Sequence, residues 1–131
     1  MPKIKVLVFG NPILRDDNLA LKLIPRLREK FPKIEFKEFD STENLKAEGK
    51  NLKIIDVAEG INKVEVIADI DKLETARLCS LHDFDLAYNL KLLKKINLID
   101  SVEIICVPLG MDEKSSFEGV SEALARILKS S

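Results

Sequence analysis

The chain has 131 residues, the length of a single domain with a sizeable core, and we predict one domain over residues 1–131. Apolar residues make up 46% and charged residues 33%, which excludes an intrinsically disordered chain. The 21 basic and 22 acidic residues leave a net charge of −1, so we expect no nucleic-acid or membrane partner. No apolar run approaches the roughly 18 residues of a membrane span, and the amino terminus shows no signal-peptide pattern. We therefore expect a cytoplasmic protein.

The amino-terminal half predicts strands that alternate with a helix. Residues 4–9 and 52–57 are near-continuous apolar runs, which are typical of strands buried on both faces. Residues 17–30 carry leucines at helical spacing, and Pro25 should bend this helix or mark a boundary in it. Residues 34–39 alternate apolar with charged side chains, which predicts a strand near a sheet edge. Residues 41–49 predict a short polar helix or loop.

The middle of the chain predicts one further strand and a second helix. Residues 63–68 follow the strand at 52–57 too closely for a parallel crossover, so this strand should run antiparallel to it or form an edge. Residues 69–77 are polar and predict a loop with a helical turn. The next helix begins near Asp83 or Asp85, with Leu86, Leu90, Leu93 and Ile96 on one face and Lys91, Lys94 and Lys95 on the other.

The carboxyl-terminal part predicts the last central strand and a closing helix. Residues 102–107 form the strand, which Pro108 ends, and residues 111–118 form a loop. The helix then runs from Phe117 or Gly119 to Lys129. These elements together predict a three-layer α/β/α sandwich with about five strands, mostly parallel with one antiparallel.

The two cysteines, Cys79 and Cys106, lie far apart among apolar neighbours, so we interpret them as small core residues rather than a disulfide or a thiolate metal site.

The candidate chemistry consists of a few acids and a single histidine, because the usual nucleophile and nucleotide motifs are absent. Asp16 and Asp17 end the segment 10–17 after the first strand, Asp56 lies at the carboxyl end of the strand at 52–57, and His82 precedes a helix. Carboxyl ends of parallel strands converge on one edge of a sheet. Two carboxylates and an imidazole there would suit a divalent transition metal, with positions left for water or substrate.

Each of these residues also has a structural interpretation. Asp17 could cap a helix, Asp56 could accept hydrogen bonds from loop amides, and His82 could be a satisfied polar residue beside a helix start. The spacing alone leaves both interpretations open.

Four segments resemble one protein family, in the family's order. The opening Gly-Asn-Pro-Ile-Leu-Arg-Asp-Asp at 10–17 resembles the signature of the [NiFe]-hydrogenase maturation endopeptidases. Three later segments are also similar to that family: the strand ending in Asp56-Val57-Ala58, the segment Ser80-Leu81-His82, and the last strand, loop and closing helix from Val107 to Leu124. Asn18 and Ala20 stand where the family commonly has glycines.

The resemblance implies an activity, a metal and a partner. The family's nickel ligands correspond to Asp17, Asp56 and His82, and Asp16 becomes a structural or substrate-facing neighbour. These four residues are then the candidate catalytic set. The implied reaction is one cut that removes the carboxyl-terminal extension of a hydrogenase large-subunit precursor after nickel insertion. The nickel then arrives with the precursor, and other divalent ions are possible surrogates.

Two other functions compete with this one. The missing turn glycines and shortened loops favour a non-catalytic α/β module that binds the nickel-loaded precursor, or another protein, without cutting it. A flavodoxin-like or receiver-like signalling domain would bind magnesium at the acids after the first strand. His82 argues against that domain, as does Pro108 where such a domain would carry a lysine.

Overall fold

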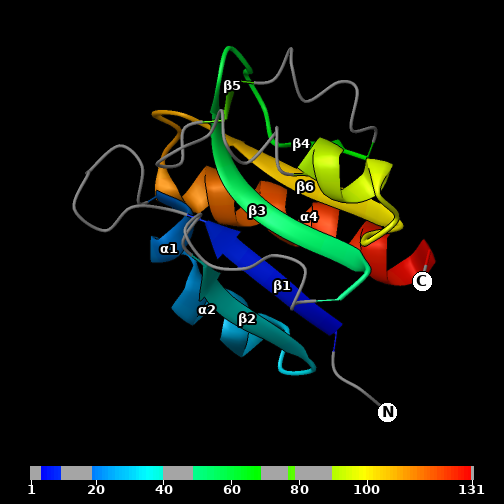
Figure 1. Ribbon diagram of the computed structural model, residues 1–131. Helices are drawn as coiled ribbons and strands as arrows, with labels where there is room; N and C mark the ends of the chain where they lie inside the picture. The colour runs from blue at the N-terminus through cyan, green and yellow to red at the C-terminus, as the bar shows by residue number, and fades with distance from the viewer. Residues whose placement is uncertain (1–3, 10–18, 40–48, 69–76, 79–89, 131) are drawn as a thin grey trace.

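The protein is described here from a computed structural model, in which residues 4–9, 19–39, 49–68, 77, 78 and 90–130 are described. Five strands form the main path of one sheet in the order β2-β1-β3-β6-β4 (Figure 1). They are β1 (Ile4–Phe9), β2 (Ile34–Phe39), β3 (Asn51–Glu59), β4 (Glu65–Ile67) and β6 (Ser101–Pro108). β2, β1, β3 and β6 run parallel, whereas β4 pairs antiparallel with β6. The predicted mixed sheet is confirmed.

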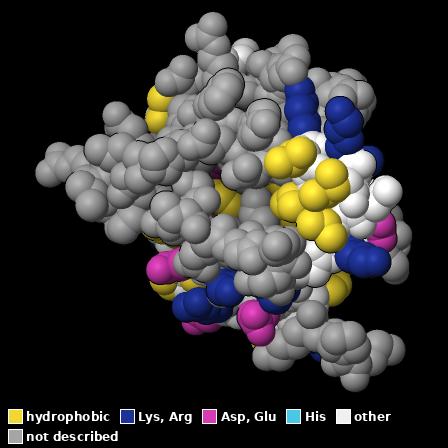
Figure 2. All heavy atoms as spheres, viewed as in Figure 1, with side chains coloured by type: hydrophobic (Ala, Val, Ile, Leu, Met, Phe, Trp, Pro, Cys, Tyr) yellow, Lys and Arg dark blue, Asp and Glu magenta, His cyan; other side chains and the backbone are white. Residues whose placement is uncertain are grey.

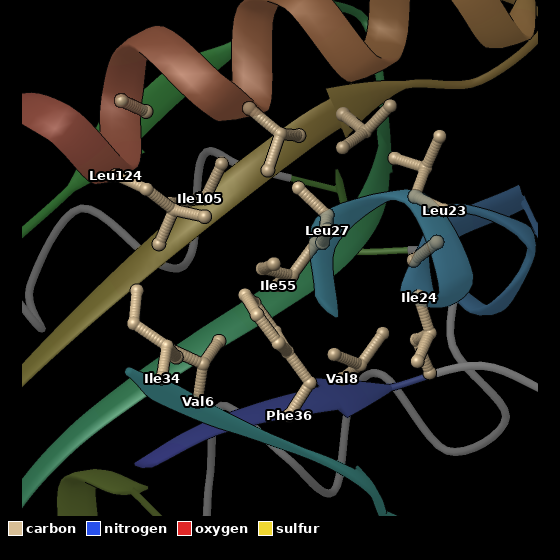
Figure 3. Packing of buried hydrophobic residues seen from close by; sticks show 14 of the residues in the cluster. Val6, Val8, Leu23, Ile24, Leu27, Ile34, Phe36, Ile55, Ile105 and Leu124 are labelled. Carbon is tan, nitrogen blue, oxygen red and sulfur yellow. The ribbon is translucent and has the colours of Figure 1, made fainter. Parts of the chain in front are cut away.

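Helices cover both faces of this sheet, as the three-layer prediction requires. α1 (Leu19–Lys22), α2 (Ile24–Lys30) and α4 (Glu113–Ser130) contribute to a core on one face, together with the odd-numbered Ile55 and Val57 of β3 (Figure 3). A helix at residues 90–95 covers the other face, where Leu90 and Leu93 pack with Ile54 and Leu7. None of the described helices is long and apolar enough to span a membrane.

The first helical segment is interrupted where its sequence predicts. α1 ends at Lys22, Leu23 lies between the helices, and Pro25 occupies the first turn of α2, where its missing N–H has no intrahelical partner to lose. Ala20 is fully buried in α1, so the position that carries glycine in the resembled family needs no positive φ here. The predicted start at Asp17 lies outside the described residues.

β4 takes the role predicted for residues 63–68. It lies at the end of the strand order and runs antiparallel to β6, and so also to β3, because β3 and β6 are parallel. β2 lies at the opposite end of the order, which confirms the edge position predicted for residues 34–39.

Three sequence-based expectations were wrong in detail. α4 begins at Glu113, within the predicted loop, because the Asp112 carboxylate accepts a hydrogen bond from the Ser115 N–H (2.9 Å) and caps the first turn. Arg77 belongs to a short strand, β5 (Arg77–Leu78), that pairs antiparallel with the end of β3. Ile96 is 52% exposed rather than inward, because the helix has ended at residue 95.

Candidate functional site

Asp56 is a fully buried carboxylate near the carboxyl end of β3, with 0% of its surface exposed. Its neighbours Ile55 and Val57 belong to the core on the α1–α2–α4 face, so the strand alternation directs Asp56 to the opposite face with Ile54 and Ala58. The Val57 N–H donates a hydrogen bond to Asp56 Oδ1 over 2.8 Å. The structure therefore places this predicted site residue inside the sheet layer, at the edge where it was expected.

The burial of Asp56 fits a functional interpretation, and its bond from the Val57 N–H also fits the structural interpretation, in which Asp56 accepts hydrogen bonds from backbone amides. Removing an ionised carboxylate from water costs several kcal/mol unless charges or hydrogen-bond donors compensate. Buried acids at the carboxyl edge of an α/β sheet are accordingly typical of ligand-binding and catalytic positions.

Two further polar residues lie in the same row of the sheet as Asp56. Cys106 of β6 is paired with Asp56, and Glu65 of β4 is paired with Cys106, so the three side chains share one face. Burial, and to a lesser extent the negative charges of Asp56 and Glu65, raise the pKa of the Cys106 thiol to about 12. The thiol, which donates to the Ile104 carbonyl over 3.9 Å, therefore stays protonated at neutral pH and is a poor nucleophile.

Several strand ends meet around Asp56. The β1–β3 register pairs Val8 with Ile55, so one more residue brings Phe9, the last residue of β1, level with Asp56. β5 pairs with Ala58 and Glu59, immediately beyond Asp56. Phe9 and Leu78 are therefore the described residues nearest in sequence to the other predicted site residues. The segment with Asp16 and Asp17 follows Phe9 in the chain, and the segment with His82 follows Leu78.

A tight turn closes the site on the β6 side. The Leu109 N–H donates to the Ala58 carbonyl over 2.9 Å, and the Met111 N–H donates to the Pro108 carbonyl over 3.2 Å. Gly110 takes a φ of 86°, which the third position of a type II turn requires and which glycine adopts without strain. This turn ties the end of β6 to the end of β3, two residues beyond Asp56.

Asp16, Asp17 and His82 lie outside the described residues, so their distances to Asp56 stay predictions. The described residues contain no group of three or more His, Cys, Asp or Glu side chains that lie close enough together to hold a metal ion. A site at Asp56 would need ligands from the segments that begin at the adjacent strand ends.

Sequence reasoning did not predict Glu65 and Cys106 as neighbours of Asp56. That proximity depends on the register of β3, β6 and β4, and no local pattern in the sequence specifies it.

Two solved structures of an endopeptidase resemble this chain over nearly its whole length. The hydrogenase maturating endopeptidase HybD from Escherichia coli superposes with a TM-score of 0.70 and 18% identity, over 98% of this chain and 94% of HybD. A solution structure of an endopeptidase from Escherichia coli gives the same values. The chain has the HybD fold.

The remaining comparisons add no function. An uncharacterized protein from Wolinella succinogenes shares the HybD-like fold less closely, with a TM-score of 0.56 and 14% identity over 98% of this chain and 96% of that one. No protein-family model and no curated protein matches the sequence. At 18% identity, the likeness to HybD establishes the fold alone.

Proposed function

We propose that this protein is an endopeptidase of hydrogenase maturation, which removes the carboxyl-terminal extension of a [NiFe]-hydrogenase large-subunit precursor after nickel insertion. The observation that carries the proposal is Asp56: a fully buried carboxylate, at the carboxyl edge of a sheet with the HybD fold, at the position that the sequence resemblance assigns to a nickel ligand. The in-order match of the segments around Asp17, Asp56 and His82 supports the same function independently of the coordinates.

The donor set suits nickel that arrives with the precursor. Two carboxylates and one imidazole offer oxygen and nitrogen ligands to a divalent transition metal and leave positions for the precursor's own ligands. Asp17, Asp56 and His82 would bind this ion. The enzyme would then recognise a precursor that is ready for cleavage by the nickel that it carries.

The chemistry follows from acids placed beside a scissile peptide bond. A carboxylate of the site, Asp16 or Asp17, accepts a proton from a water molecule as its oxygen attacks the scissile carbonyl carbon. The carbon–nitrogen bond then breaks, and the proton passes to the departing amine. The products are a mature carboxyl terminus and a free peptide, with no covalent intermediate and no need for a nucleophilic serine or cysteine.

The proposal is tested by the mass of the precursor. Purified protein is incubated with nickel-loaded and with nickel-free precursor, and the large subunit is weighed by mass spectrometry. We expect a single loss of a carboxyl-terminal peptide from the loaded precursor alone. Binding without any mass loss would instead favour the non-catalytic module, and cleavage that ignores nickel would overturn the recognition role of the metal.

A further inference from the structure

Three large apolar side chains are exposed together at the end of the helix at residues 90–95. Leu92, Ile96 and Leu98 are 42%, 52% and 40% exposed. Figure 2 shows hydrophobic side chains gathered in one patch near that helix, with Lys and Arg side chains beside them. Most exposed apolar residues are scattered singly, so a contiguous group indicates a contact surface. We call these three residues the 92–98 patch.

The backbone holds the 92–98 patch in a defined geometry. Asn97 adopts a positive φ of 63°, the Leu98 N–H donates to the Leu93 carbonyl (2.9 Å) and the Asn97 N–H donates to the Lys94 carbonyl (3.1 Å). These two bonds form a Schellman motif, which ends a helix in a fixed turn. Leu92 and Ile96 lie one helical turn apart, so they share a face. The exposed surface is therefore already ordered before any partner binds.

Lysines outnumber acids around the patch, although Asp100, two residues after Leu98, is also exposed. Lys91, Lys94 and Lys95 lie among residues 90–98, which contain no acid. Lys50 is also exposed nearby, since its carbonyl accepts hydrogen bonds from the Asp100 and Ser101 N–H groups that follow the patch. Two copies of this surface would place lysines opposite lysines, which disfavours a symmetric dimer. A partner with apolar side chains inside an acidic rim complements it.

The patch and Asp56 lie on the same face of the sheet, the patch beside the amino ends of β3 and β6 and Asp56 near their carboxyl ends. Leu90 and Leu93 of the same helix belong to the core that contains Cys106, and Cys106 is paired with Asp56. We propose that the 92–98 patch docks the hydrogenase large-subunit precursor, through apolar side chains of the precursor surrounded by acidic residues. This inference rests on the proposed function, because it takes that precursor as the partner.

The test measures the affinity of the nickel-loaded precursor for surface variants. Leu92→Ser with Ile96→Ser should raise Kd about tenfold or more, since apolar residues at the centre of an interface carry much of its affinity. Lys94→Glu with Lys95→Glu should also raise Kd and should reduce its dependence on salt concentration, because exposed ion pairs are screened by salt. All four positions are exposed, so circular dichroism and Tm should stay at the wild-type values.

Val66 supplies the matched control. It is 40% exposed, and its pairing with Ile105 places it on the opposite face of the sheet. Val66→Ser should leave Kd unchanged. The docking proposal is overturned if Val66→Ser weakens binding as much as the patch variants, if the patch variants bind like wild type, or if wild type does not bind the precursor. It is also overturned if wild type sediments as a dimer that the patch substitutions dissociate.

Separate measurements of binding and of cleavage distinguish a failure of the docking proposal from a failure of the proposed endopeptidase function. A wild-type protein that binds through the patch but never cuts the precursor supports docking and overturns the endopeptidase. A wild-type protein that cuts the precursor, together with patch variants that bind and cut equally well, supports the endopeptidase and overturns docking.

Discussion

Asp56 is buried more completely than an acid at a strand end needs to be. Its Oδ1 accepts a hydrogen bond from the adjacent Val57 N–H, and Cys106, its partner on β6, is itself 1% exposed. The row therefore keeps a carboxylate in a low-dielectric position, where its interaction with a cation is stronger than in water. Such a position is compatible with the metal recognition that we propose for Asp56.

Asp56→Asn keeps the size of the side chain and removes its charge. We expect processing of the nickel-loaded precursor to fall by about 100-fold or more. Stability should be kept or raised, because an uncharged amide is cheaper to bury than a carboxylate. Mass spectrometry of the precursor and chemical unfolding measure the two effects. Asp100→Asn, at an exposed position immediately before β6, is the control and should process normally. Equal loss in both variants would argue against a special role of Asp56.

Cys106 gives a pH dependence with a definite sign. Its folded-state pKa of about 12 lies above the ordinary value of 9.0, mainly because of burial and then because of Asp56 and Glu65. The unfolded thiol ionises near pH 9 while the folded thiol stays neutral, so stability falls as pH rises from 9 towards 12. In a Cys79→Ser background, Cys106→Ala should flatten this fall, by on the order of 3 kcal/mol near pH 12. Parallel slopes for the two proteins in urea unfolding would refute the assignment.

The start of α4 depends on the Asp112 cap. The Ser115 N–H bond lowers the pKa of the Asp112 carboxyl below its ordinary value of 3.8, so its contribution to stability is present above that value and is lost as pH falls through the lowered pKa. Asp112→Ala should lower Tm at pH 7. At acidic pH its Tm should approach that of wild type, because the wild-type carboxyl is then protonated. Asp112→Asn keeps an acceptor and should retain most of Tm at pH 7. Thermal unfolding at pH 7 and at pH 2 tests this, and a Tm loss that persists unchanged at pH 2 would contradict it.

Gly119 lets α4 approach the segment before β4. A Cβ at this position would lie 2.5 Å from Val64 Cγ2 and 2.8 Å from Val64 Cβ, so the backbone would have to shift. Overpacking of this kind costs about 1–3 kcal/mol, which outweighs the roughly 1 kcal/mol that alanine gains over glycine in a helix. Gly119→Ala should therefore lower the free energy of unfolding.

A double-mutant cycle checks the cause of that loss. Val64→Ala removes both Cγ atoms that the new Cβ would meet, so Gly119→Ala should cost less in the Val64→Ala background than in wild type. Because alanine keeps the Cβ at 2.8 Å, additive effects in chemical unfolding would show that the Val64 Cγ contacts are not responsible.

The sequence predicted elements better than it predicted their ends and neighbours. The apolar runs of β1, β3 and β6 and the break at Pro25 follow from local patterns, and the structure has them where expected. The start of α4 was missed because the Asp112 cap was not recognised, and β5 was missed because two residues carry no periodicity. Ile96 fits a helical repeat, yet the turn at Asn97 ends the helix before that residue can pack inward.

The candidate site, like the fold, was predictable from the sequence only in part. The position of Asp56 was predictable, because a polar residue interrupts an apolar strand at its carboxyl end, and the structure has it there, fully buried. Its role in the site stays a prediction. Its contact row with Cys106 and Glu65 was not predictable, because it depends on pairing between strands far apart in sequence. The roles of Asp16, Asp17 and His82 in the site stay predictions from the sequence, because these residues lie outside the described part of the chain.

At the scale of the whole molecule, the two sheet faces have different tasks. The α1–α2–α4 face buries a continuous apolar core that stabilises the domain. The opposite face combines the Asp56 row with a helix whose last turn exposes the 92–98 patch and its lysines. Both faces thus bury apolar cores that hold the fold, and the second face also carries the candidate site and the proposed docking surface.

The most direct test of the central claim is the mass of nickel-loaded large-subunit precursor after incubation with single-residue variants. The account predicts one carboxyl-terminal cut by wild type and no cut by Asp17→Asn, Asp56→Asn or His82→Ala, each with the circular dichroism of the folded protein. Normal cleavage by His82→Ala or by Asp56→Asn would contradict the assignment of these residues to one nickel-recognising site.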